Sequence, residues 1–222
     1  MVCGHRYGLR HGRTPHRLHF AGKAFRPSEG SSPLFLVNPT PLDPTSASIA
    51  VLCIDVQPVF LRAVTDGDRL LRRCQFVVAA AHGLGLRVVF TEQVPAKLGG
   101  TAPELLSAAP GAMAFGKDTF SALADDTIRH ALAPAEHLLV CGLETPVCVY
   151  QTALDALHAG LHVTLLSDAV GARRPDDATA CLAALARAGA HVLPSESVFY
   201  ALLGHVRHPF FKTYTQLVKS HG

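Results

Sequence analysis

The sequence of 222 residues lacks three features that would each define a class of protein. No apolar run approaches the roughly 20 residues that a helix needs to cross a bilayer, so we expect no membrane partner. The six cysteines contain no C-x-x-C pair, and no apolar signal segment indicates secretion. We therefore expect free thiols in a reducing compartment, with one reactive cysteine among several inert ones in the core.

Acidic residues are absent before Glu29, although this segment contains many arginines and histidines. The net charge of +3 originates there, and the rest of the chain is slightly acidic. No broad basic face remains for a phosphate backbone, so we do not expect nucleic acid as a partner. An Arg-rich, acid-free N-terminus is typical of mitochondrial transit peptides, and a disordered basic tail on a cytoplasmic protein is the alternative interpretation.

The chain divides into an N-terminal extension and one folded domain. Residues 27–48 are rich in Pro, Ser and Thr, as linkers are. We assign residues 1–46 to a basic, disordered extension and linker, and residues 47–222 to a single domain. The length is enough for one sizeable core but not comfortably for two.

Short apolar runs alternate with helical patterns along this domain. The expected strands are 49–55, 86–91, 113–115, 137–142, 161–167 and 190–193. The expected helices are 66–84, 125–132, 145–158, 175–188 and a last one capped by Ser195. Continuous apolar strands separated by helices predict an α/β fold, a single doubly wound, Rossmann-like and mostly parallel sheet with helices on both faces. Such sheets bind ligands beyond the carboxyl ends of their strands.

Three of those strand ends carry residues suited to nucleophilic chemistry. Asp55 follows the first strand, Lys117 follows the third, and Cys148 lies in the first turn of the helix after the fourth. We expect Thr145 to cap that helix, and the amides of its first turn to lower the pKa of the Cys148 thiol. A nearby lysine would lower this pKa further, and a carboxylate could take the proton. Each residue alone has an ordinary structural interpretation, but their joint position predicts a nucleophilic site.

Three segments resemble, in order and spacing, the signature segments of the isochorismatase-like cysteine hydrolases. They are residues 52–57 (LCIDVQ), 115–121 (FGKDTFS) and 142–149 (GLETPVCV). Residues 91–95 and 208–212 are similar in particular to the eukaryotic isochorismatase domain-containing proteins. The resemblance runs from the first expected strand to the end of the chain, and it implies the isochorismatase-like hydrolase fold.

The resemblance implies a role for each of the three residues. Cys148 attacks an electrophilic carbon, Asp55 takes the thiol proton and passes it to the leaving group, and Lys117 holds both charges together. It also implies a cis peptide bond between Leu143 and Glu144, with the backbone amides of Glu144 and Cys148 forming an oxyanion hole. A thiol nucleophile favours a small amide or imide-like C–N bond as the target over the vinyl ether of isochorismate.

The expected site contains no metal and no other cofactor. In the nicotinamidase branch of the family an acid and histidines bind a metal, whereas Gln93 and Pro95 stand at matching positions in this sequence. We expect Gln57, Phe60 and Gln93 to line the pocket around the nucleophile.

Partners and alternative functions follow from the same resemblance. We expect a small-molecule substrate and a homo-oligomer, either a dimer or a tetramer, by analogy with relatives. Arg173 and Arg174 could reach the same rim to meet an anionic substrate, although a charged loop is the plainer interpretation. The alternatives to a hydrolase are a non-catalytic, oligomeric binding protein and a mitochondrial ribonuclease, as some relatives are labelled.

Overall fold

The computed structural model of the protein describes residues 48–221. They belong to one of two units of the chain, the one that spans Leu42–Gly222. The extension and linker assigned to residues 1–46 lie outside the described residues. No helix between residues 48 and 221 is long and apolar enough to cross a membrane.

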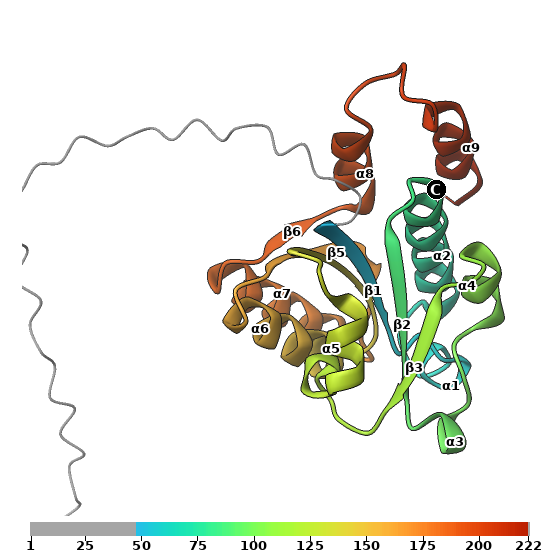
Figure 1. Ribbon diagram of the computed structural model, residues 1–222. Coiled ribbons are helices and arrows are strands. Elements are labelled where there is room, and N and C mark those ends of the chain that lie inside the picture. The colour runs from blue at the N-terminus through green and yellow to red at the C-terminus, as the bar shows by residue number, and fades with distance from the viewer. Residues whose placement is uncertain (1–47, 222) are drawn as a thin grey trace, which may run out of the picture. The chain divides into compact units, whose positions relative to one another are not determined.

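A six-stranded parallel sheet forms the centre of this unit (Figure 1). Its strands are β1 (Ile49–Ile54), β2 (Arg87–Gln93), β3 (Met113–Lys117), β4 (His137–Gly142), β5 (His162–Val170) and β6 (His191–Leu193). Their order across the sheet is β3-β2-β1-β4-β5-β6, so the chain winds outward from β1 first to one side and then to the other. This order confirms the predicted doubly wound α/β fold.

The register of neighbouring strands brings four carboxyl ends together. Ile54, the last residue of β1, pairs with Thr91 of β2 and with Gly142 of β4. Gln93 at the end of β2 pairs with Lys117 at the end of β3. The residues that end these strands, or directly follow them, therefore share one edge of the sheet, which is where ligands bind in such folds.

Helices cover both faces of the sheet (Figure 1). The helical segments are α1 (Pro58–Leu61), α2 (Gly67–Gly83), α3 (Pro95–Leu98), α4 (Pro103–Ala108), η2 (Ala122–Ala124), α5 (Asp126–Leu132), η3 (Thr145–Val149), α6 (Tyr150–His158), α7 (Pro175–Arg187), α8 (Ser195–Leu203) and α9 (Phe211–His221). Residues of α2, α4, α8 and α9 pack in one core, and residues of α5, α6 and α7 pack in the other. The helical segments that were not predicted are α1, α3, α4, η2 and α9.

The central strand shows why the sequence signal was continuous rather than alternating. Val51 and Cys53 of β1 point into the first core, whereas Ala50 and Leu52 point into the second. Both faces of the strand are therefore buried and apolar, as in other parallel sheets covered on both sides.

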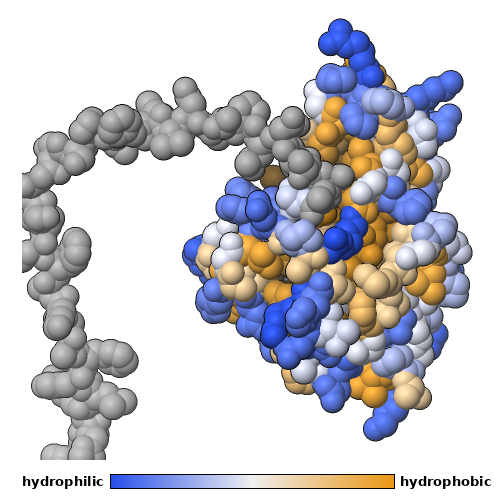
Figure 2. Space-filling view, in the orientation of Figure 1, coloured by the Kyte–Doolittle hydropathy of each residue, from blue (hydrophilic) through white to orange (hydrophobic). Residues whose placement is uncertain are grey.

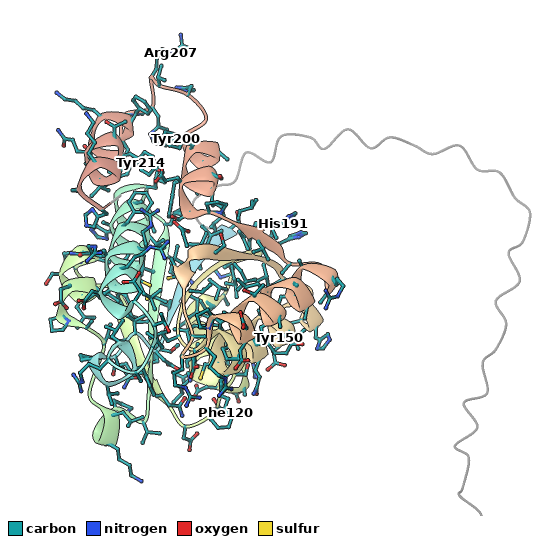
Figure 3. The ribbon with its side chains drawn as sticks, turned by 180° about the vertical axis from the view of Figure 1, so that it is seen from behind. Phe120, Tyr150, His191, Tyr200, Arg207 and Tyr214 are labelled. Atoms are coloured by element: carbon teal, nitrogen blue, oxygen red, sulfur yellow. The ribbon has the colours of Figure 1, made fainter. Side chains whose placement is uncertain are left out.

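The C-terminal helices attach to α2 through aromatic side chains. Phe76 of α2 packs edge-on against Phe199 of α8, with ring centroids 5.9 Å apart. The ring centroids of Tyr214 of α9 and Tyr200 of α8 are 5.0 Å apart, and Figure 3 shows both tyrosines between the two helices. Tyr214 is the fully buried residue of α9, and the partly buried Phe211, Leu217 and Val218 pack beside it against the same core. These residues recur at helical spacing, so the signal for this helix was present in the sequence but was not recognised.

Two helix starts differ from the prediction. Thr145 is not the N-cap, because Glu144 has that position and the π-helical turn η3 leads into α6. The Thr145 hydroxyl donates instead to a backbone carbonyl of the segment that follows β5 (2.9 Å). Ser195 is the first residue of α8 rather than its cap, and its hydroxyl donates to the carboxylate of Asp168 (2.7 Å). In both cases a partner distant in sequence takes the hydroxyl that a local cap would have used.

Candidate active site

Asp55, Lys117 and Cys148 meet at the carboxyl edge of the sheet. The Nζ atom of Lys117 lies 2.7 Å from Oδ2 of Asp55 and 3.7 Å from Sγ of Cys148. All three residues are buried. The fold thus brings together the three residues that were singled out at three separate strand ends.

Asp55 is held by β2 as well as by Lys117. Its amide donates to the carbonyl oxygen of Thr91 (3.0 Å), and its Oδ1 accepts a hydrogen bond from the Thr91 hydroxyl (2.7 Å). Asp55 adopts φ 51°, a left-handed conformation that is uncommon outside glycine. The charge of this carboxylate raises the pKa of the Cys148 thiol, and the thiol itself donates to Oε1 of Gln93 (4.0 Å). Backbone and side chain together therefore aim this carboxylate at both other members of the site.

The ammonium group of Lys117 has several partners besides Asp55 and Cys148. It donates to Oε1 of Gln93 (2.6 Å) and to the carbonyl oxygen of Thr119 (3.0 Å). A buried charge is tolerated when it is paired and hydrogen-bonded in this way. Lys117 is therefore a fixed positive charge placed between the carboxylate and the sulfur.

The pKa of Cys148 is shifted in the direction opposite to the prediction. Burial and, second, the negative charge of Asp55 raise the pKa of this thiol to about 12. The Lys117 ammonium and the backbone amide of Glu144 act in the lowering direction, but they do not outweigh burial and the carboxylate. The prediction considered the helix start and the lysine without the desolvation that the closed site imposes. The resting sulfur is therefore a thiol, and its proton has to leave when the sulfur attacks.

The turn before Cys148 has the predicted backbone conformation. The peptide bond between Leu143 and Glu144 is cis, which confirms that prediction. The loop after β5 braces this turn, because the amide of Thr145 donates to the carbonyl oxygen of Gly171 (2.8 Å). The Glu144 amide in the same turn acts to lower the pKa of the Cys148 thiol.

A cavity of about 420 Å³ opens onto the sulfur. Its apolar lining consists of Val59, Phe60, Ala63, Val64, Phe120 and Val147. Its polar lining consists of Asp55, Gln93, Glu144, Cys148 and Arg173. Phe120, which Figure 3 labels, is 57% exposed and lies at the mouth, whereas Cys148 is 7% exposed and lies at the floor. A cavity of this volume suits a small molecule.

Two of the three residues expected to line the cavity do so. Phe60 and Gln93 are part of its wall, but Gln57 is not. Gln57 is fully buried, and its Oε1 accepts a hydrogen bond from the amide of Gln93 (2.7 Å) while its Nε2 donates to the carbonyl oxygens of Gln93 and Gly99. Its side chain bonds the backbone at the end of β2 and at Gly99 instead of facing the cavity, because buried backbone N–H and C=O groups need hydrogen-bond partners. Gln57 thus supports Gln93, which in turn contacts Lys117.

An ion pair at the cavity rim was not identified from the sequence. The carboxylate of Glu144 accepts hydrogen bonds from Nε of Arg173 (3.0 and 3.1 Å) and from the Arg173 amide (3.0 Å). Arg173 had been set aside as one of two arginines in a charged loop. Its position after a strand end was the available signal, but only the fold shows that it faces the cavity while Arg174 pairs with Asp177.

Three other cysteines form a separate cluster in the first core. The sulfur atoms of Cys53, Cys74 and Cys141 lie within 4.8 Å of one another, and all three residues are buried. In the described part of the chain this cluster is the group of side chains with a geometry that could hold a metal ion. It shares no residue with the cavity above Cys148.

Comparison with known proteins places the chain in a family. The isochorismatase domain matches residues 49–197. Isochorismatase domain-containing protein 2 of Bos taurus is 36% identical over 174 residues, which cover 78% of this chain and 83% of that protein. Secreted isochorismatase effector Isc1 of Phytophthora sojae is 33% identical over 181 residues, which cover 79% of this chain and 86% of that protein.

The fold has a close match among solved structures. The structure of MAR1 ribonuclease from Caenorhabditis elegans superimposes with a TM-score of 0.76 at 29% identity, covering 80% of this chain and 93% of that one. The parallel sheet and these matches together define an α/β protein of a hydrolase class. The chain belongs to the isochorismatase family.

Proposed function

We propose that the protein is a cysteine hydrolase that cleaves a small amide or imide-like C–N bond. The observation that supports this most directly is the position of Lys117 Nζ between Oδ2 of Asp55 (2.7 Å) and Sγ of Cys148 (3.7 Å), at the floor of a cavity. Nucleophile, base and fixed charge are then within reach of one bound molecule.

In this mechanism Asp55 takes the proton of the Cys148 thiol as the sulfur attacks the carbonyl carbon of the substrate. A C–S bond forms, and the carbonyl π electrons move to the oxygen. The protonated Asp55 then gives its proton to the leaving nitrogen, and the C–N bond breaks to leave a thioester. Asp55 then takes a proton from water as the water oxygen attacks the thioester carbon. The C–S bond breaks to release the acid, and Asp55 returns the proton to the sulfur, which restores the thiol.

The charges of the site fit this sequence of steps. The resting pair of Asp55 and Lys117 is neutral as a whole, with the thiol protonated. When the proton moves to Asp55, the negative charge moves to the sulfur and then to the substrate oxygen, while the ammonium stays in place. The backbone amides of Glu144 and Cys148 are the proposed donors to that oxygen, and one such donor contributes about 3 kcal/mol of transition-state stabilisation.

The test is a hydrolysis screen of small amides, ureides and imides, with release of ammonia or amine as the readout. We expect at least one compound to be cleaved by the wild type and the rate to fall roughly 10⁴-fold in Cys148→Ala. The acyl-enzyme should appear by mass spectrometry on the peptide that contains Cys148. Hydrolysis that continues at the wild-type rate in Cys148→Ala would contradict the proposal.

Ribonuclease activity is the second candidate, because the matched structure from Caenorhabditis elegans carries that name. The small, largely apolar cavity above Cys148 favours a small substrate instead. RNA cleavage by the purified protein that persists in Cys148→Ala would favour the ribonuclease. A third candidate, a binding protein without catalysis, would be favoured if no compound is hydrolysed and no acyl-enzyme forms.

A homo-oligomer is part of the same proposal. On the face shown in Figure 2, hydrophobic residues reach the surface between α8 and α9. Tyr200 and Val206 are large hydrophobic residues with exposed side chains in this part of the chain. Light scattering coupled to size exclusion should give a mass of two or four chains, and a monomer at micromolar concentration would contradict this expectation.

A further inference from the structure

The polar groups of the cavity differ in how many of their hydrogen bonds are already made. Asp55 is occupied by Lys117 and Thr91, and Gln93 is occupied by Lys117 and a backbone carbonyl. These groups have little capacity left for recognising a ligand. Arg173 is different, since only part of its guanidinium group is engaged.

The engaged part of Arg173 is one edge of its fork. Nε and the backbone amide both donate to the carboxylate of Glu144, at 3.0–3.1 Å. Among residues 48–221, no hydrogen bond joins Nη1 or Nη2 of Arg173 to an acceptor. The guanidinium group is planar, and its two terminal nitrogens match the two oxygens of a carboxylate. Glu144 therefore orients the fork and leaves its terminal edge open.

The position of Arg173 shows which part of a ligand would meet that edge. The Arg173 side chain is 56% exposed, so it belongs to the mouth, whereas Asp55 and Cys148 lie at the floor. Apolar side chains such as Phe60 and Val147 form the wall of the cavity. A ligand that reaches from floor to mouth would have its reactive carbonyl at the sulfur, an apolar middle, and its other end at the guanidinium group.

We propose that Arg173 is a specificity-determining residue that binds a carboxylate, so that the substrate class is a short amide with a carboxylate at the end away from the scissile bond. The hydrolysis of that amide rests on the proposed function, but the recognition of the carboxylate does not. Arg173 binds the anion through its terminal edge, and Glu144 is the positioning residue that holds the opposite edge.

Matched acid and amide probes test this assignment. Succinamate and succinamide differ only in carboxylate against carboxamide, and glutaramate and glutaramide form a longer pair. For each probe, kcat and KM are measured, together with its protection of Cys148 against iodoacetamide. We expect the wild type to prefer the acid of at least one pair by roughly 10- to 100-fold in KM or protection.

Substitutions then separate recognition from structural support. In Arg173→Gln the acid and the diamide should become equivalent, so that their ratio in KM or in protection falls to about 1. Arg173→Lys keeps the charge but lacks the fork, so part of the preference should remain. Arg174→Gln is the matched control, because Arg174 pairs with Asp177 and does not line the cavity, and it should keep the full preference.

Each other outcome has a defined meaning. Equal protection by acid and diamide in the wild type, or no protection by any acid, overturns the assignment of Arg173. Loss of kcat for acid and diamide alike in Arg173→Gln overturns it too, because Arg173 would then only brace Glu144. Protection that prefers the acid without any hydrolysis supports the assignment while it contradicts the hydrolase, so the two proposals fail separately.

Discussion

Asparagine at position 55 should separate the two effects that this carboxylate has on the sulfur. In the wild type the charge of Asp55 raises the pKa of Cys148, and the same carboxylate is the proposed acceptor of its proton. Asp55→Asn keeps the size of the side chain but removes both the charge and the acceptor. The variant should therefore have a more reactive thiol and a less active enzyme.

The size of the first effect follows from the geometry. Asp55 and Cys148 both contact Lys117 Nζ, at 2.7 and 3.7 Å. Two unit charges about 4 Å apart interact by about 4 kcal/mol at an effective dielectric constant of about 20, which sets an upper bound of roughly 3 pKa units on the effect of Asp55. Lys117 also loses its carboxylate partner, so a Cys148 thiolate 3.7 Å away becomes its counterion. A thiolate of lower pKa is a weaker nucleophile, which leaves a net gain in alkylation rate of at most about 30-fold.

The assay is the rate of iodoacetamide labelling of the Cys148 peptide between pH 7 and 10, followed by mass spectrometry. Hydrolysis of the best substrate should fall by about 10²–10⁴-fold in the same variant, because a positioned base is lost. Asp118→Asn is the matched control, since Asp118 is an exposed neighbour of the lysine in sequence. If Asp55→Asn is alkylated no faster than the wild type, the electrostatic account of the site is wrong. If it also hydrolyses at the wild-type rate, Asp55 is not the base.

Two further predictions concern stability. Gly142→Ala should lower the free energy of unfolding by about 3 kcal/mol or more, because the residue has φ 111° and a Cβ atom would collide with a backbone carbonyl of β1. Gly160→Ala also has a positive φ but no atom within 4 Å of a Cβ, so urea denaturation should show a loss of only about 1 kcal/mol; equal losses in the two variants would contradict this reasoning. Arg73→Met should cost about 3–5 kcal/mol at pH 7, because it leaves the carboxylate of Asp168 without the ion pair at 2.6 Å, whereas the exposed Arg72→Met should cost little. Burial alone would raise the pKa of Asp168, but hydrogen bonds from the first residue of α8 and from Arg73 lower it overall. The stability that this carboxylate contributes is therefore present above the ordinary carboxyl pKa and is lost as the pH falls below about 4. An acid unfolding curve equally steep in Arg73→Met would refute the assignment.

Much of the fold could be read from local patterns. The six strands were predicted within a few residues. In β1, β2, β4 and β5 burial on both faces leaves a continuous apolar run in the sequence, whereas the edge strands β3 and β6 are mostly exposed. The ends of α2 and α7 were recognisable because stop signals follow the apolar periodicity. Helix α9 was missed although Phe211, Tyr214 and Leu217 recur at helical spacing and pack against the first core.

The members of the site could be named from the sequence, but their electrostatics could not. Asp55 and Lys117 are 62 residues apart, and each stands at a strand end that the pattern itself marks. The direction of the Cys148 pKa shift depends on burial and on the distance to both partners, which no local pattern encodes. The placement of the Gln57 side chain against Gln93, rather than in the cavity, likewise depends on contacts between distant segments.

The alternation of the six strands with the longer helices along the chain, and the chemical identity of the residues at the strand ends, were determined by the sequence alone, since periodicity and turn residues act over a few positions. The pairing of Glu144 with Arg173, the support of Gln93 by Gln57 and the protonated state of the resting sulfur were decided only by the tertiary structure. The physical reason is that desolvation and charge interactions depend on distances between segments, and packing of the whole sheet sets those distances.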